Sequence, residues 1–273
     1  MKYSFTVLLL LFSYSLVADT KVLSFGVVPQ QVSATLTKVW VPILKHISHE
    51  TGLTIQFKTA PDIPRFEKKL AQTAYDIAYI NPYHYVSFHG STDYRAFAKQ
   101  KDKNIQGIMV VHKDSDYTKL EQLQGSELVF PSPGAFAASI LTRAYFKKNG
   151  IDITPKYVSS HDSVYYNVAK KLYPAGGGIH RTFNAIDASI RQQLKILWVS
   201  KPYTPHAFVA RKTLLAEDIN KIQTSLINLE QTEQGRLLLK SLKFSGIESA
   251  KDQDWNDIRT LKLNDLNMYL TND

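Results

Sequence analysis

The chain of 273 residues contains no cysteine. That absence excludes disulfide bridges, cysteine-ligated zinc, a thiol nucleophile and the cysteine that anchors a lipoprotein. Long apolar runs are also missing beyond the N-terminus, so no later segment is long enough to span a bilayer as a helix. Aromatic residues make up 11% and hydrophobic residues 44% of the chain, which excludes a disordered polypeptide and predicts a globular fold.

The one strongly apolar run lies at the N-terminus. Lys2 precedes the apolar stretch 7–12, and small residues lead up to Ala18. The run is too short for a membrane anchor, because about 20 apolar residues are needed to span a bilayer. The pattern therefore predicts a signal peptide over residues 1–18 that is cleaved after Ala18. We expect the rest of the chain to be exported.

Positive charge exceeds negative charge, with 33 Lys and Arg against 24 Asp and Glu. The excess lies in the first two-thirds of the chain, and the last third is close to neutral. A basic protein attracts anionic partners at long range. No cluster of Lys and Arg alternates with aromatic residues, so nucleic acid is not the expected partner. A small anion is.

Strands and helices alternate along the chain, which predicts an α/β fold with mostly parallel sheets and helices on both faces. Strands are expected at 22–28, 53–58, 75–80, 94–99, 106–112, 128–130, 156–159, 195–199 and 206–210. Helices are expected at 32–51, 135–149, 163–172, 181–191 and 214–242, with shorter ones between them.

So many strands without a long linker indicate two interleaved lobes rather than two separate domains. We expect the chain to cross between the lobes near His112 and again near Tyr203–Pro205. The first lobe would then contain residues 19–111, the second 112–204, and the return to the first lobe 205–273. Ligands of such sheets bind beyond the carboxyl ends of the strands.

One candidate anion site is the turn 131–134, which follows a strand and opens a helix. The free N–H groups and the dipole at a helix start favour an anion. The alternative is a plain turn in which Ser132 caps the helix. A second candidate is His161, between a strand and a helix, which could donate a hydrogen bond to a ligand oxygen; the alternative is a surface histidine in a loop.

The string Gly176–Gly178 could present successive N–H groups as an anion nest, and Arg181 could bind phosphate oxygens in a bidentate manner. The alternative is a flexible loop with Arg181 in water. Tyr79 and Asn81 follow the third strand and are the candidates from the first lobe.

Other chemistry is not indicated. His46 and His49 lie three residues apart on the first helix, but no acid or third histidine completes a metal site, so we assign them to a solvated face. Neither a Gly-x-Ser-x-Gly elbow nor a His-Glu-x-x-His string is present.

Several segments in order resemble the periplasmic phosphate/phosphite/phosphonate-binding proteins of ABC transporters, which form a type II periplasmic binding-protein family. The segments are 25–31, 40–42, 60–66, 75–85, 110–115, 130–133, 160–163 and 198–202. The resemblance covers nearly the whole chain after residue 18. It implies two lobes that close on a ligand, and no catalysis.

The resemblance also implies which residues hold the ligand. In that family the phosphonate is held by a Ser/Thr-rich helix start, by a histidine after the next strand and by aromatic residues of the first lobe. A turn beside these aromatics corresponds to Asp62-Ile63 in this chain. This chain departs from the pattern twice: Ser132 is the only hydroxyl in its turn, and residues 175–183 lack the acid thought to meet the amino group of aminophosphonates. The residues expected to contact ligand are Tyr79, Asn81, Ser132, Gly134, Ala135, Phe136, His161, Gly177, Arg181 and Thr182.

We therefore expect a monomeric solute-binding protein that captures a phosphate-like oxyanion or phosphonate and delivers it to an ABC permease, without cofactor or metal. The alternative is a ligand-sensing module of a sensor-kinase system, which would have the same fold. An exported hydrolase is a third class, which the missing catalytic motifs disfavour.

Overall fold

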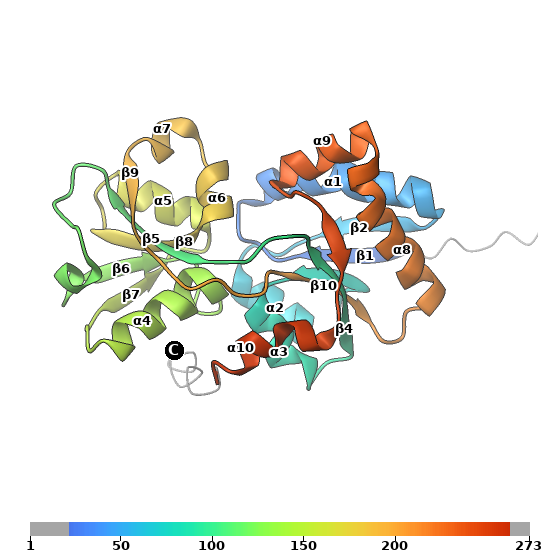
Figure 1. Ribbon diagram of the computed structural model, residues 1–273, viewed down its shortest axis with the longest axis horizontal. Helices are drawn as coiled ribbons and strands as arrows, with labels where there is room; N and C mark the ends of the chain where they lie inside the picture. The colour runs from blue at the N-terminus through green and yellow to red at the C-terminus, as the bar shows by residue number, and fades with distance from the viewer. Residues whose placement is uncertain (1–21, 263–273) are drawn as a thin grey trace, which may run out of the picture.

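The computed structural model describes residues 22–262, so the predicted signal peptide lies outside the described residues. It shows two α/β lobes joined by two extended segments (Figure 1). Each lobe is built on its own mixed sheet, so the predicted two-lobed α/β fold is confirmed. Within residues 22–262 no helix is long and apolar enough to cross a membrane.

The first lobe contains a six-stranded sheet with the order β11-β4-β10-β3-β1-β2. Its strands are β1 (Val22–Val27), β2 (Thr54–Lys58), β3 (Ile77–Ile80), β4 (Tyr94–Gln100), β10 (Ala207–Arg211) and β11 (Ile247–Ser249). Its helical segments are α1 (Ser33–Thr51), α2 (Ile63–Ala71), α3 (Pro82–His89), α8 (Ala216–Asn228), η3 (Leu229–Gln231), α9 (Glu233–Leu242), η4 (Asp252–Trp255) and α10 (Asn256–Arg259). Figure 1 shows α1 and α9 on one face of this sheet and α2, α3 and α10 on the other.

The second lobe contains a five-stranded sheet with the order β7-β6-β8-β5-β9. Its strands are β5 (Gly107–His112), β6 (Glu127–Phe130), β7 (Thr154–Tyr157), β8 (Ala175–Ile179) and β9 (Leu194–Val199). Its helical segments are η1 (Leu120–Leu123), η2 (Phe136–Leu141), α4 (Thr142–Lys148), α5 (His161–Ala169), α6 (His180–Ala185) and α7 (Ala188–Arg191).

The expectation of mostly parallel pairing is wrong for about half of the strand pairs. β1 pairs in parallel with β2 and β3, and β6 pairs in parallel with β7 and β8. β10 and β5, in contrast, run antiparallel to both of their neighbours. Each of these two strands begins directly after a crossing, so it enters its sheet from the boundary between the lobes. Consequently its first residues lie beside the carboxyl ends of the parallel strands.

The crossings are the segments 101–106 and 200–206. The first was expected near His112, but β5 already pairs with β8 and β9, so residues 107–112 belong to the second sheet. The second crossing lies where it was expected. The two crossings pair with each other, because the N–H groups of Ile105 and Tyr203 donate to each other's carbonyl oxygens at 2.8 and 3.0 Å.

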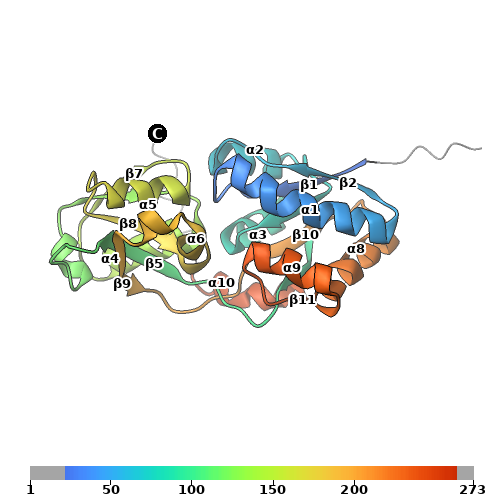
Figure 2. The ribbon, with the colours of Figure 1, turned by 90° about the horizontal axis from the view of Figure 1, so that it is seen from above.

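The helix expected at 135–149 consists of a π-helical turn, η2, that continues into α4. Ala135–Ala138, Ile140 and Leu141 belong to the same buried apolar cluster as the core of the first lobe, which includes Trp40 and Phe208. The start of η2 therefore lies against the first lobe, and Figure 2 shows the two lobes facing each other across this boundary.

The glycine string Gly176–Gly178 forms part of β8 and is not an anion-binding loop. A methyl group on Gly177 would overlap the carbonyl oxygen of Ala138, and one on Gly107 in β5 would overlap that of Ala137. These glycines let the backbone of η2 lie directly on the sheet. The string was misassigned because a run of glycines permits either close backbone packing or a loop.

Candidate functional site

A small buried cavity lies between the two lobes, where their sheets approach each other. Its volume is about 10 Å³, which is room for roughly one water molecule. Every wall comes from a strand end, a helix start or a crossing. The lining residues are Gln30, Ile63, Asn81, Ile105, Ala135, Phe136, Ala137, Ala138, His161, Ile179 and His206.

The start of η2 forms one wall of this cavity, through Ala135 to Ala138. The first N–H groups of a helix have no acceptor within the helix. Two buried hydroxyl groups belong to the same region, Ser132 before the helix and Ser139 within it. Neither hydroxyl has a hydrogen-bond partner among the described residues. The helix start therefore offers several unused hydrogen-bond donors in one place.

His161 forms a second wall and is 1% exposed. Its backbone N–H donates to the carbonyl oxygen of Gln30 in the first lobe at 3.0 Å. Its ring Nδ1 lies 3.1 Å from the hydroxyl oxygen of Thr182, and within residues 22–262 its Nε2 has no partner. Burial, together with the nearby Arg181 guanidinium, lowers the pKa of His161 to about 3. The imidazole is therefore neutral at pH 7.

A second buried histidine, His206, directly precedes β10. Its ring stacks on Tyr79 with the centroids 5.0 Å apart, and its Nε2 also has no partner within the described part of the chain. Burial lowers the pKa of His206 well below its usual value, and Arg181 contributes in the same direction. Two neutral imidazoles thus line one cavity, each with an unused ring nitrogen.

Arg181 lies next to the cavity and links the lobes, because its guanidinium donates to the side-chain oxygen of Gln30. It influences the pKa values of Tyr79, His161 and His206. Burial raises the pKa of Tyr79 to about 12, so its hydroxyl stays protonated. Arg181 is thus a fixed positive charge among neutral donors.

Asn81 and Gly134 form a contact between the lobes. The Asn81 amide donates to the carbonyl oxygen of Gly134 at 3.0 Å, and its side-chain oxygen accepts from the N–H of His84 at 2.8 Å. The Glu67 carboxylate lies 2.8 Å from Nε2 of His84 and would overlap a side chain added at Gly134. Gly134 therefore faces the first lobe and not the cavity.

The predicted site residues divide into three groups. Asn81, Ala135, Phe136 and His161 line the cavity, and Tyr79 and Arg181 line a cavity that adjoins it. Ser132 and Thr182 are buried beside these walls. Gly134 and Gly177 line neither cavity, since the first contacts the other lobe and the second lies in β8 beneath η2.

The sequence analysis missed Gln30, Ile105 and His206 as site residues. Gln30 follows the first strand, so its position beyond a carboxyl end was an available signal. Ile105 and His206 lie on the crossings, and no local pattern distinguishes a crossing residue that faces a cavity from one that faces solvent.

The walls of the cavity favour an anion. No Asp or Glu lines it, whereas a helix start, two imidazole nitrogens and a neighbouring guanidinium converge on it. Buried polar atoms without partners cost free energy, and a ligand that accepts hydrogen bonds would remove that cost. Helix-start N–H groups bind negatively charged oxygens well.

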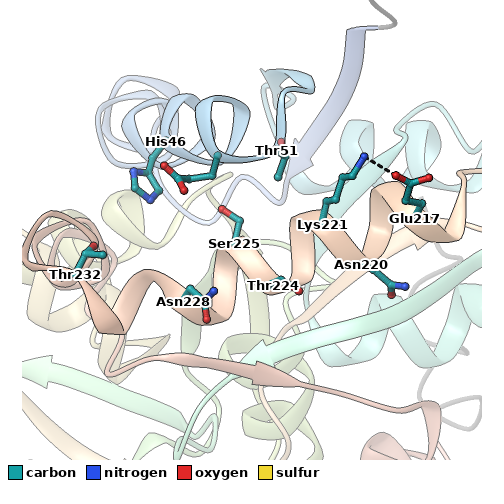
Figure 3. A pocket seen from close by; sticks show the side chains of 10 residues that line it. His46, Thr51, Glu217, Asn220, Lys221, Thr224, Ser225, Asn228 and Thr232 are labelled. Atoms are coloured by element: carbon teal, nitrogen blue, oxygen red, sulfur yellow. Dashed lines mark ion pairs between the residues drawn. The ribbon is translucent and has the colours of Figure 1, made fainter.

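The larger groove on the outer side of the first lobe does not share these properties. It has a volume of about 650 Å³ and lies between α1 and α8 (Figure 3). Glu50 and Glu217 line it, and its only lysine, Lys221, is paired with Glu217 at 2.7 Å. His46 lies in this groove, half-buried, and not on a fully solvated face as expected. Within residues 22–262 no group of His, Asp and Glu is arranged to hold a metal ion.

Two α/β lobes joined by paired crossings, with the cavity between them, define a type II periplasmic binding-protein fold. The family model for ABC transporter phosphonate periplasmic substrate-binding proteins matches residues 25–255. The chain belongs to this family, which confirms the resemblance and the role of a periplasmic binding component of an ABC transporter.

Individual relatives are distant in sequence. The phosphate-import protein PhnD of Mycolicibacterium smegmatis is 23% identical over 74% of this chain and 70% of its own. The binding protein of an ABC phosphonate transporter from Pseudomonas aeruginosa has a TM-score of 0.83 at 21% identity, covering 93% of this chain and 90% of its own. PhnD1 of Prochlorococcus marinus, solved with methylphosphonate, has a TM-score of 0.81 at 18% identity, covering 91% of this chain and 99% of its own.

Proposed function

We propose that the cavity between the lobes binds the phosphorus oxyanion group of phosphate or a small phosphonate. The observation that supports this most strongly is that the unpartnered ring nitrogens of His161 and His206 and the start of η2 line one buried cavity. The unpartnered hydroxyls of Ser132 and Ser139 lie in the same segment of chain as that helix start. The relatives named for phosphate import and solved with methylphosphonate agree with this ligand class.

In this proposal the oxyanion accepts hydrogen bonds from Nε2 of His161 and from the N–H groups at the start of η2, and Arg181 supplies the compensating charge. The small cavity holds about one water, which is less than a tetrahedral oxyanion needs. The lobes must therefore separate about the two crossings for a ligand to enter, and they close again around it.

We further propose that the protein is a monomer that delivers its ligand to an ABC permease, and that its cleaved signal ends at residue 18. We propose no catalytic step, since binding and release by lobe movement are sufficient for delivery. Sequencing the N-terminus of periplasmic protein would test the cleavage site.

The binding proposal predicts that His161→Ala weakens binding of methylphosphonate or phosphate roughly ten- to hundredfold. The reason is the loss of a hydrogen bond to a charged acceptor, worth about 1.5–3 kcal/mol. Isothermal titration calorimetry measures the affinity. The control is His49→Ala, because the His49 side chain is 87% exposed. Unchanged affinity in His161→Ala would place the ligand elsewhere.

A second variant tests how His161 is positioned. The Thr182 hydroxyl contacts both Nδ1 of His161 and the Tyr165 hydroxyl, the latter at 2.8 Å. A hydroxyl that donates to Nδ1 leaves the proton of the neutral ring on Nε2, where it faces the cavity. We expect Thr182→Val to weaken oxyanion binding about fivefold. Thr182→Ser should restore the affinity, and equal affinity of both variants would rule out this positioning role.

A further inference from the structure

A second cavity of about 440 Å³ adjoins the first one. The two cavities share Ile105, Ile179 and His206 as lining residues, so they meet at the crossings. Tyr79 and Arg181 also line the second cavity. It is far larger than the first, and a group attached to a bound oxyanion would extend into it.

The lining of this second cavity is basic. Lys103, His180, Arg181 and Lys243 contribute to it, and we call these four residues the basic annex. No Asp or Glu lines the second cavity; its other polar groups are neutral amides and the Tyr79 and His206 rings. Lys103 is close enough to His180 to lower the pKa of the imidazole, in addition to the effect of burial.

Two lysines close to Lys103 in the sequence differ from it in having acidic partners. On the same stretch of chain, Lys99 pairs with Asp254 at 2.8 Å and Lys101 pairs with Glu230 at 2.8 Å. Lys103 and Lys243, in contrast, have no acidic partner within residues 22–262, and the Arg181 side chain is bonded to the neutral Gln30. Lys99 and Lys101 are thus neutralised by acidic partners, whereas Lys103 and Lys243, which line the second cavity, are exposed and have no such partner within the described residues.

We propose that the basic annex binds a carboxylate on the substituent of the ligand, so that the preferred ligand class is a carboxyalkylphosphonate. This inference rests on the proposed function, since it requires the phosphorus oxyanion to occupy the first cavity. An oxyanion there would use Arg181, and its substituent would then face Lys103 and Lys243. A carboxylate would be attracted by these ammonium groups, and an amino substituent would be repelled.

The test compares three probes that differ in the substituent: phosphonoacetate, methylphosphonate and 2-aminoethylphosphonate. By calorimetry at one ionic strength, we expect phosphonoacetate to bind roughly tenfold or more tightly than methylphosphonate, because a charge-assisted hydrogen bond is gained. We expect 2-aminoethylphosphonate to bind most weakly.

Substitutions in the basic annex test whether it causes the preference for phosphonoacetate over methylphosphonate. Lys103→Gln and Lys243→Gln should each reduce the advantage of phosphonoacetate and leave the affinity for methylphosphonate nearly unchanged. The control is Lys212→Gln, which removes the same charge from an exposed residue after β10, outside both cavities. It should leave the order of the three probes unchanged.

The outcomes separate the two proposals. If none of the three probes nor phosphate binds, the proposed function fails. If methylphosphonate binds but phosphonoacetate is not preferred, or if 2-aminoethylphosphonate binds at least as tightly, only the inference on the annex is overturned. A preference for phosphonoacetate that survives in both lysine variants would also overturn it.

Discussion

Gly177→Ala should lower the free energy of unfolding by about 3 kcal/mol, at the upper end of typical overpacking costs. The added methyl group would overlap the carbonyl oxygen of Ala138 and press on the ring of Phe130. A backbone oxygen cannot rotate away as a side chain can, so η2 itself would have to shift. Because the start of η2 forms a wall of the proposed oxyanion site, affinity should fall together with stability.

Urea denaturation measures this change, and Gly90→Ala is the matched control. Gly90 follows α3 with a φ of −77°, and no atom outside its neighbours lies within 4 Å of an added methyl group. We expect the control to unfold at the urea concentration of the unmodified protein or slightly above it. If Gly177→Ala also unfolded at the urea concentration of the unmodified protein, η2 would not pack against the glycines of β8.

Acidification from pH 6.5 to pH 5 should destabilise the ligand-free protein strongly. His161 and His206 both have folded-state pKa values below the unfolded value of 6.5, that of His161 at about 3. Below pH 6.5 the unfolded chain therefore binds protons that the folded protein does not, and stability falls with pH. Each such histidine contributes about 1.4 kcal/mol per pH unit, and the loss continues until the folded-state pKa is reached.

Denaturant titrations at several pH values measure this slope. His161→Gln and His206→Gln should each reduce it by about one proton, and the exposed His49→Gln should not. Asp76 does not interfere in this window, because its pKa is lowered from 3.8 and its contribution to stability is lost only at more acidic pH. A slope that is the same in all three variants would show that the two buried imidazoles are protonated in the folded state.

The sequence predicts much of this architecture because its signals are local. Alternating strands and helices indicate two α/β lobes, and the proline–glycine turn before residue 135 marks the helix start that lines the cavity. His161 is predicted mainly by the resemblance, in which a histidine follows the next strand. Its burial was not predictable, because the Gln30 carbonyl that caps it lies 131 residues earlier in the chain.

Features that depend on tertiary packing were misassigned or missed. The glycine string indicates close approach of backbone, but only the position of η2 shows what approaches it. His206 gives no local signal, because its role arises from the crossing that brings it against Tyr79. Gly134 lies in the expected turn, yet the Asn81 amide of the other lobe donates to its carbonyl oxygen.

A crystal structure with methylphosphonate tests the central proposal most directly. We predict that the phosphorus group lies at the start of η2, between the lobes, with one oxygen within hydrogen-bond distance of Nε2 of His161 and another close to the N–H groups of residues 136–138. A phosphorus group in the groove between α1 and α8, or at any other place that leaves His161 Nε2 without a partner, would contradict the proposal.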